Sequence, residues 1–312
     1  MNEIEIVGLG EIVVDWVMQI PHFPKPDEKI DALSENIFPG GVTANFLVAA
    51  SRLGGKCGFI GAIGDDEYGN FLVKDLKDES IDTTLTLKKP GMKTPINFIF
   101  VVKGEKTIIQ SPHMQTTKLD ISDLDDSYIA RARVLHTTMI HLDLTKKAFK
   151  IAKENDVKIS IDLESQIASK GWQSLKNYLL QADVLIPNKE GAKSITKTTS
   201  PETAARILVK KGIPIVIITL GEKGALITTK KYQKRIPAFH VKNVVDTTGA
   251  GDTFNGAFTV AYWLKNWDVE KACLFANAAA SLKVQKLGAR VGIPSEQELE
   301  RFLKKHYDDF FS

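Results

Sequence analysis

Cysteine is scarce in this sequence, which excludes two classes of protein. The 312 residues include two cysteines, Cys57 and Cys273, whereas a disulfide framework or a thiolate zinc site needs more. We expect both to be buried free thiols in a reducing compartment. The first residues include acids where a secretory signal carries positive charge, so we predict a cytoplasmic protein.

Long apolar runs and an excess of one charge are also lacking. No uninterrupted apolar stretch approaches the roughly 20 residues that a membrane helix requires, so we expect no membrane partner. Lysine and arginine total 41 against 38 acidic residues, a net charge of +3. Nucleic-acid binding needs basic residues gathered in a patch, and we expect no such partner either. The 43% hydrophobic and 25% charged residues are typical of a globular protein.

Short runs rich in isoleucine and valine alternate with segments of helical periodicity. This pattern predicts a mainly parallel sheet that helices cover on both faces, an α/β fold. The predicted strands are Ile4–Gly10, Gly58–Ile63, Val134–Met139, Lys158–Asp162, Val184–Pro187 and Pro214–Leu220. The predicted helices are Ala44–Leu53, Tyr68–Glu79, Leu144–Asn155, Pro201–Lys211, Gly249–Leu264, Val269–Lys286 and Ser295–His306.

Two stretches interrupt this alternation. Residues 12–40 contain several prolines, among them Pro21, Pro24 and Pro26, and no helical period, and residues 94–111 are typical of a hairpin with its turn at 103–105. We predict that both belong to a small β-sheet that stands off the main sheet as a lid. The sequence has no internal repeat or long linker, so residues 1–312 are predicted to form one domain that carries this lid.

The most informative segment is a loop of small residues, Asp-Thr-Thr-Gly-Ala-Gly-Asp, from Asp246 to Asp252. It leads into a predicted helix, whose free amides and positive dipole end form an anion site. The same helix end favours the ionised form of Asp252. A carboxylate beside an anion site is what phosphoryl transfer to a hydroxyl needs. The alternative is a surface turn in which Asp252 merely caps the helix.

Two further loops have the residues of a binding site. Gly40 and Gly41 precede a predicted helix and allow a ligand to approach closely, and Asn45 offers a donor and acceptors to hydroxyl groups. Residues 218–224 follow an apolar strand, at the edge of a parallel sheet where ligands bind. Each loop is also compatible with an ordinary glycine turn.

Several common nucleotide and metal motifs are absent. Nothing matches the P-loop pattern, Gly8-Leu-Gly10 lacks the third glycine of a dinucleotide fingerprint, and the six histidines show no metal-ligand spacing. A nucleotide bound by this chain must therefore be held in another way.

Together the motifs resemble the ribokinase family of sugar kinases, also called the PfkB family. The likeness continues to Pro294 and so spans nearly the whole chain. It implies a ribokinase-like three-layer α/β/α core with a mainly parallel central sheet and a small β-sheet lid. It also implies an ATP-dependent kinase that uses Mg²⁺. The blocks, in the family's order, are Gly40-Gly41-x-x-x-Asn45 with the run from Gly61 to Gly69, then Thr219-x-Gly221, then Asp246 to Asp252.

The resemblance implies a role for each matching residue. Asp252 matches the general base that takes the proton from the accepting hydroxyl. The amides of Gly249, Ala250, Gly251 and Asp252 match an anion hole for the transferred phosphoryl group. The residues that match the sugar site are Asp15, Gly41 and Asn45. Those that match the nucleotide site are Asn188, Thr219, Gly221 and Asn277.

The resemblance also implies cation sites. The family's N-x-x-E element, which helps to organise Mg²⁺, is altered here to Asn188-Lys189-Glu190-Gly191, with the glutamate one residue early. Either Glu190 serves through a shifted backbone, or the metal depends more on phosphates and water. Potassium is predicted to increase activity. The matching residues are Asp246, the carbonyl of Thr248 and the backbone near Lys283, Lys286, Gly288 and Gly292.

A kinase for a small sugar is the leading function, and alternatives stay open. A nucleoside kinase on the same fold would need an apolar wall for the base, for which Trp16, Phe98, Phe100 and Met114 lie in or beside the lid segments. A non-catalytic sugar-binding regulator is disfavoured by the intact loop that ends at Asp252. Exposed edges of a small lid sheet also predict a homodimer formed through the lid.

Overall fold

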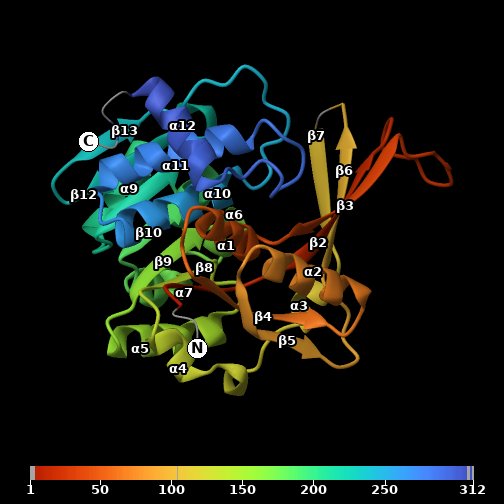
Figure 1. Ribbon diagram of the computed structural model, residues 1–312, viewed down its shortest axis with the longest axis horizontal. Helices are drawn as coiled ribbons and strands as arrows, with labels where there is room; N and C mark the ends of the chain where they lie inside the picture. The colour runs from red at the N-terminus through yellow and green to blue at the C-terminus, as the bar shows by residue number, and fades with distance from the viewer. Residues whose placement is uncertain (1–3, 104, 308–309, 311–312) are drawn as a thin grey trace.

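The structure is a computed structural model that describes residues 4–103, 105–307 and 310. A nine-stranded sheet lies between two layers of helices, and a four-stranded sheet stands at one side of this body (Figure 1). The three-layer α/β/α core predicted from the sequence is confirmed. Gly104, in the predicted turn at 103–105, lies outside the described residues.

The large sheet is parallel from β5 to β11, and β12 and β13 join one edge as an antiparallel pair. All six predicted strands are present, with ends that differ by at most two residues. The edge strand β5 and the pair β12–β13 were not among the predicted strands. In sheet order the strands are β13 (Gln233–Ile236), β12 (Ala225–Thr229), β11 (Ile215–Thr219), β10 (Val184–Pro187), β9 (Lys158–Leu163), β8 (Val134–Thr137), β1 (Ile6–Leu9), β4 (Cys57–Gly64) and β5 (Asp82–Lys89).

Neighbouring residues of a strand point to opposite faces of the sheet, so each strand contributes to two cores. Ile6 packs in one apolar cluster and Val7 in the other, and both are fully buried. One cluster lies under α1, α2, α10, α11 and α12, and the second under α4 to α9. Both cysteines are free and buried, as expected. Among the described residues, no helix combines the length and apolar character needed to span a membrane.

The helices begin where the sequence supplies caps. Ser295 accepts a hydrogen bond from the amide of Glu298, whose side chain accepts one from the amide of Ser295 in return, which forms a capping box. The helices are α1 (Val42–Arg52), α2 (Glu67–Asp78), α3 (His113–Thr116), α4 (Asp126–Ala130), α5 (Leu142–Glu154), α6 (Ser165–Ala168), α7 (Trp172–Leu179), α8 (Lys189–Thr196), α9 (Pro201–Lys210), α10 (Ala250–Thr259), α11 (Val269–Lys283) and α12 (Glu296–His306), with short turns η1 (Ile121–Asp123), η2 (Gly221–Lys223) and η3 (Val260–Leu264).

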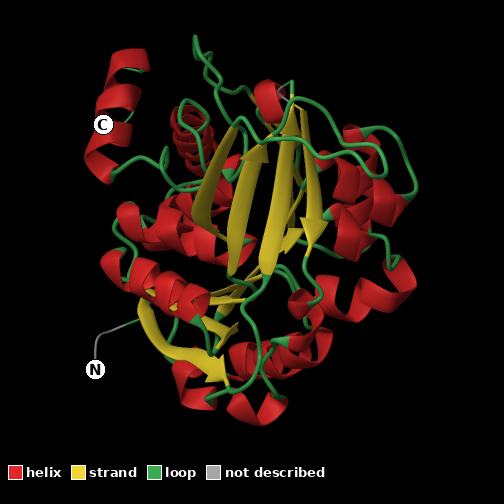
Figure 2. Cartoon of the chain, turned by 90° about the vertical axis from the view of Figure 1, so that its right-hand side faces the viewer, coloured by secondary structure: helices red, strands yellow, loops and turns green. Residues whose placement is uncertain are grey.

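The four-stranded sheet, called the lid below, is built from the two segments that interrupt the α/β alternation. In Figure 2 its strands stand upright and face the viewer. Parallel pairing of β2 with β6 joins the two segments, although about 80 residues separate them along the chain. In sheet order the lid strands are β3 (Ser34–Gly40), β2 (Val13–Gln19), β6 (Ile96–Val102) and β7 (Glu105–Gln110).

Candidate active site

A cleft of about 620 Å³ lies between the lid and the carboxyl ends of the parallel strands. Ligands bind at this edge of parallel sheets, because the strand ends and helix N-termini meet there. The lid contributes Val13, Asp15, Asn97, Ile99, Lys106, Ile108 and Gln110. Residues at or just beyond the strand ends are Glu11, Thr138, Asp162, Glu164, Asn188 and Thr219.

Asp252 lies in the first turn of α10 and lines this cleft. The side-chain amide of Asn45, Nδ2, donates a hydrogen bond to Asp252 Oδ2 at 2.8 Å. Burial raises the pKa of Asp252 to about 7. The Asn45 hydrogen bond opposes that shift, and the charges of Glu164, Glu11 and Asp15 add to it. The expectation of a carboxylate favoured in its ionised form is therefore corrected: this group titrates near neutral pH, as suits a base that must accept a proton.

The loop before Asp252 presents open backbone. Gly249 has a φ of 78°, and a Cβ there would lie 2.5 Å from the carbonyl oxygen of Ala289, so glycine is required. The amide of Ala250 donates within its own turn. No described residue accepts a hydrogen bond from the amides of Gly251 and Asp252. These two amides, at the positive end of α10, are available to an anion in the cleft.

Asp15 and Asn45 approach the cleft from two elements. Asp15 on β2 is 6% exposed, and its Oδ1 accepts a hydrogen bond from Asn97 Nδ2 at 2.9 Å. Burial raises the pKa of Asp15, against the hydrogen bond from Asn97 and the charge of Arg290. Asn45 lies in the first turn of α1, four residues after Gly41 at the N-cap. All three residues predicted for the sugar site, Asp15, Gly41 and Asn45, line the cleft.

Arg290 is a site residue that the sequence interpretation missed. The residue is 4% exposed, and its Nε donates to Asn45 Oδ1 at 2.8 Å. Its other nitrogens bind the carbonyl of Gly40 and the carboxylate of Asp75 on α2. Because Asn45 Oδ1 accepts from Arg290, its Nδ2 faces Asp252. No local pattern reveals this role, because the partners are 215 to 250 residues apart.

The residues predicted for the nucleotide are only partly brought together. Asn188 and Thr219 line the cleft and pair with each other at the ends of β10 and β11. Asn277 is buried, and its Nδ2 donates to the carbonyls of Ile236 and Pro237. Gly221 lies in the turn η2. Neither Gly221 nor Asn277 is among the residues that line the cleft.

Three carboxylates that the sequence interpretation did not select also line the cleft: Glu11, Asp162 and Glu164. Burial raises the pKa of each, and that of Glu11 reaches about 7. Thr138 donates to Glu11, and Asn255 donates to Asp162. Their position in the sequence could have identified them. Asp162 lies near the end of the buried strand β9, and Glu164 and Glu11 lie within two residues after β9 and β1.

Glu190 does not reach the cleft, so its proposed service through a shifted backbone is not supported. Its side chain is 64% exposed and pairs with Lys193 at 2.9 Å along α8. The next residue, Gly191, packs so closely that a Cβ would lie 2.3 Å from the carbonyl oxygen of Leu163. A glutamate at position 191 would not fit this backbone. In the described residues, no cluster of three histidine, cysteine or acidic side chains is arranged to hold a metal.

The residues predicted for potassium form one tight unit behind the loop of small residues. Asp246 Oδ1 accepts from the amide and hydroxyl of Thr248, and its Oδ2 accepts from the amide of Gly288 at 2.9 Å. The Nζ of Lys283 donates to the carbonyl of Asp246 at 2.8 Å. Burial lowers the pKa of Lys283, while the carboxylates of Asp246 and Asp252 act in the opposite direction. The side chain of Lys286 is exposed.

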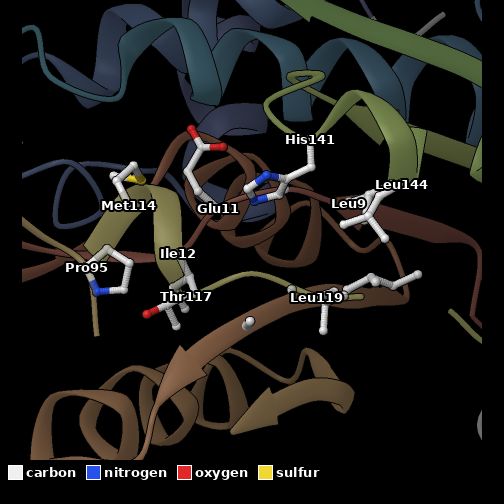
Figure 3. A pocket seen from close by; sticks show the side chains of 13 residues that line it. Leu9, Glu11, Ile12, Pro95, Met114, Thr117, Leu119, His141 and Leu144 are labelled. Carbon is white, nitrogen blue, oxygen red and sulfur yellow. The ribbon is translucent and has the colours of Figure 1, made fainter. Parts of the chain in front are cut away.

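A second, smaller pocket lies beside the main cleft and shares Glu11 and Met114 with it. Figure 3 shows the side chains of Glu11 and His141 at its rim, with Leu9 and Leu144 to one side. Its volume of about 10 Å³ holds at most one water molecule. This pocket is therefore too small for a substrate.

With this geometry in place, comparison with known proteins is decisive. Residues 3–296 match the family described as pfkB family carbohydrate kinase. The chain belongs to this family. The kinase is 34% identical over 312 residues to a ribokinase of Haemophilus influenzae, an alignment that covers 95% of this chain and 97% of that protein. The resemblance read from the motifs is confirmed.

Solved structures agree with the kinase in fold. The ribokinase of Thermotoga maritima superposes with a TM-score of 0.81 at 31% identity, over 96% of this chain and 99% of that one. A putative ribokinase II from E. coli, solved in complex with ATP and Mg²⁺, has a TM-score of 0.83 at 24% identity, over 97% and 100% of the two chains. The protein is thus an ATP-dependent carbohydrate kinase with the ribokinase-like fold predicted from its sequence.

Proposed function

We propose that this kinase transfers the γ-phosphoryl group of ATP to a hydroxyl of a small sugar, with Asp252 as the general base. One arrangement carries the proposal: a partly buried carboxylate, held by Asn45, lies beside two open amides at the start of α10. A base and an anion site are thereby combined in one helical turn. A helix-capping aspartate would instead bond to the amides of its own turn, which Asp252 does not do.

The transfer follows from these positions. The acceptor hydroxyl gives its proton to a carboxylate oxygen of Asp252 as its oxygen forms a bond to the γ-phosphorus. The bond from that phosphorus to the bridging oxygen of ADP breaks at the same time. The amides of Gly251 and Asp252 donate to the equatorial oxygens of the phosphoryl group, and the dipole of α10 favours their charge.

Magnesium fits the chemistry of the cleft. Mg²⁺ prefers oxygen ligands and commonly takes one or two carboxylates together with phosphates and water. Glu164 lines the cleft, and its carboxylate has no hydrogen-bond donor among the described residues; Asp162 lies two residues before it. These two carboxylates, with Asn188, would hold the ion. When bound, Mg²⁺ would neutralise charge on the phosphates of ATP.

The lining of the cleft favours a sugar over a nucleoside. Side chains alternate along lid strands, so Asp15, Asn97 and Gln110 face the cleft while Trp16 and Phe98 lie on the other face. The aromatic wall expected for a nucleoside is therefore turned away, and of the four residues considered for it Met114 alone lines the cleft. Ribose is the first acceptor to test, because relatives above 30% identity are named ribokinases.

The proposal extends to the molecule as a whole. Residues 1–312 act as one kinase domain, the lid closes over the acceptor, and the protein works in the cytoplasm, where its buried thiols stay reduced.

Two copies pair through their lids. A cross-strand row of apolar side chains, Ile37, Trp16, Phe98 and Ile109, lies on the lid face opposite the cleft. Ile109 is 55% exposed and Ile37 40% exposed, so a second lid would cover them.

A panel assay tests the function. ADP release is measured with ATP and Mg²⁺ for D-ribose, 2-deoxy-D-ribose, D-fructose and adenosine, with wild type and Asp252→Asn in parallel. We expect turnover with a sugar that the variant loses. Turnover with adenosine alone would assign a nucleoside kinase, and binding of sugar without any turnover would assign a regulator.

A further inference from the structure

The loop behind the anion site contains a buried positive charge. Lys283, the last residue of α11, is 0% exposed, and it is the one fully buried lysine among the lysines that the structure describes. Burying an ammonium is costly unless it is paired and hydrogen-bonded. A lysine is therefore kept at this place by specific partners and not by packing alone.

Its partners belong to the loop that positions the catalytic turn. Lys283 Nζ donates to the carbonyl of Asp246 at 2.8 Å, and the carboxylates of Asp246 and Asp252 both act on its charge. Asp246 in turn holds Thr248 and Gly288. The ammonium thus lies on the loop that carries the anion site, and Asp246 links that loop to the segment after α11.

The segment after α11 packs tightly against the same place. A Cβ at Gly292 would lie 2.1 Å from the carbonyl oxygen of Lys283, and a Cβ at Gly249 would lie 2.5 Å from that of Ala289. The amides of Val245 and Asp246 donate to the carbonyl of Val284. A potassium ion bound by Asp246 and the neighbouring carbonyls would meet the Lys283 ammonium, which already donates to the carbonyl of Asp246. The residues present do not fit that ion.

We propose that the ammonium of Lys283 takes the place of a monovalent cation, so that this kinase is independent of potassium. The tethered charge fixes the carbonyl of Asp246 and supports the anion site without touching substrate. Lys283 is therefore a positioning residue. The inference rests on the proposed kinase function for its activity readout, but its binding readout needs no acceptor.

The activity test compares salts at constant ionic strength. ADP release from ATP and the sugar found in the panel is measured in potassium, sodium and choline chloride. We expect wild-type rates within twofold of each other. Lys283→Ala, which removes the charge and opens space, should lose at least tenfold in kcat/KM in choline, and potassium should restore at least fivefold. Lys305→Ala, which removes an exposed lysine of α12, should behave as wild type in every salt.

The binding test uses the unliganded protein. Potassium should raise the melting temperature of Lys283→Ala above its value in choline chloride, and should leave that of the wild type unchanged. Potassium activation of the wild type, or Lys283→Ala at full activity in choline, would overturn the proposal. Lys283→Met serves if Lys283→Ala fails to fold: it should lose activity that no salt restores, because the side chain still fills the space. A wild type inactive on every acceptor would contradict the kinase function, while the melting series would still decide the role of Lys283.

Discussion

Asp252 combines two properties that are hard to obtain in one side chain. It must be ionised to accept a proton, yet burial raises its pKa to about 7. The hydrogen bond from Asn45 acts against that shift and orients one carboxylate oxygen. A general base is most effective when its pKa lies near the working pH. The raised pKa therefore suits the proposed role as general base, at a cost in stability.

Replacement of Asp252 by asparagine should abolish most turnover. General-base catalysis contributes roughly 10² to 10⁴ in rate, so we expect kcat for Asp252→Asn to fall by that factor. The dissociation constant for ATP, measured by calorimetry, should stay within about threefold of wild type, because the amides of the turn remain. Near-normal turnover would remove Asp252 from the mechanism.

The raised pKa of Asp252 also predicts a pH dependence. Turnover of the wild type should rise with pH through about 7 and then level off, because the base must lose its proton. The native state holds this proton more tightly than the unfolded chain, so the carboxylate costs stability as pH rises from about 4 to above 7. The melting temperature of Asp252→Asn should therefore exceed that of wild type by more at pH 8 than at pH 5. A melting-temperature difference that shrinks as the pH rises would contradict a raised pKa at Asp252.

At the scale of elements, one buried arginine ties three of them together. Arg290 connects α2 through Asp75, the end of β3 through the carbonyl of Gly40, and α1 through Asn45. These bonds fix the positions of lid strand β3, helix α1 and the segment after α11 relative to the cleft. Asp75 lies outside the cleft, so it tests this arrangement without touching substrate.

Loss of Asp75 should destabilise the whole fold. Breaking a buried ion pair leaves an uncompensated charge, and because Asp75 is partly exposed we expect Asp75→Ala to cost about 2 kcal/mol in the free energy of unfolding. Asp78→Ala, on the same helix, removes an exposed pair with Lys74 and should cost less than about 0.5 kcal/mol. Urea unfolding of both variants makes the comparison. Equal losses would show that Arg290 does not depend on Asp75.

Lid strand β2 carries Asp15, the proposed acceptor contact. Asp15→Ala should lower kcat/KM for the sugar at least tenfold, on the order of one lost charged hydrogen bond. The KM for ATP should barely change, because Asp15 lies on the lid, at the proposed acceptor end of the cleft. Initial rates with each substrate varied in turn separate the two constants. An unchanged kcat/KM for the sugar together with weaker ATP binding would show that Asp15 acts at the ATP end of the cleft instead.

For the whole molecule, the lid predicts an assembly. The row of Ile37, Trp16, Phe98 and Ile109 leaves apolar surface exposed on a small sheet with two open edges. Light scattering at micromolar concentration should give a dimer, and Ile109→Lys should shift it to monomer. Lys106→Ala is not a suitable control, because Lys106 lines the cleft. Glu105→Ala, at the other end of β7, leaves the row intact and should stay dimeric. A fully active wild-type monomer would refute the lid dimer.

The sequence by itself determined the layers and the chemistry of this protein. Alternation of apolar strands with amphipathic helices predicted the core, because period and burial are local properties. The loop from Asp246 to Asp252 predicted the anion site, because small residues before a helix have the same consequence in any fold. Edge strand β5 escaped prediction because it contains only two apolar residues, Leu85 and Leu87, among threonines and lysines, so its alternation is too short to be distinctive.

Tertiary structure decided which side chains meet. Arg290 reaches Asn45 across 245 residues, and Glu11 and Glu164 converge on Asp252 from two strands. No local pattern encodes such meetings, because they depend on sheet order and on the crossing of distant segments. The same holds for Glu190, which the chain order places near the nucleotide but which the turn of α8 directs to solvent. Lys283 is the clearest case: the family resemblance implies that its backbone binds a cation, and only the tertiary structure shows that its own ammonium donates to the carbonyl of Asp246.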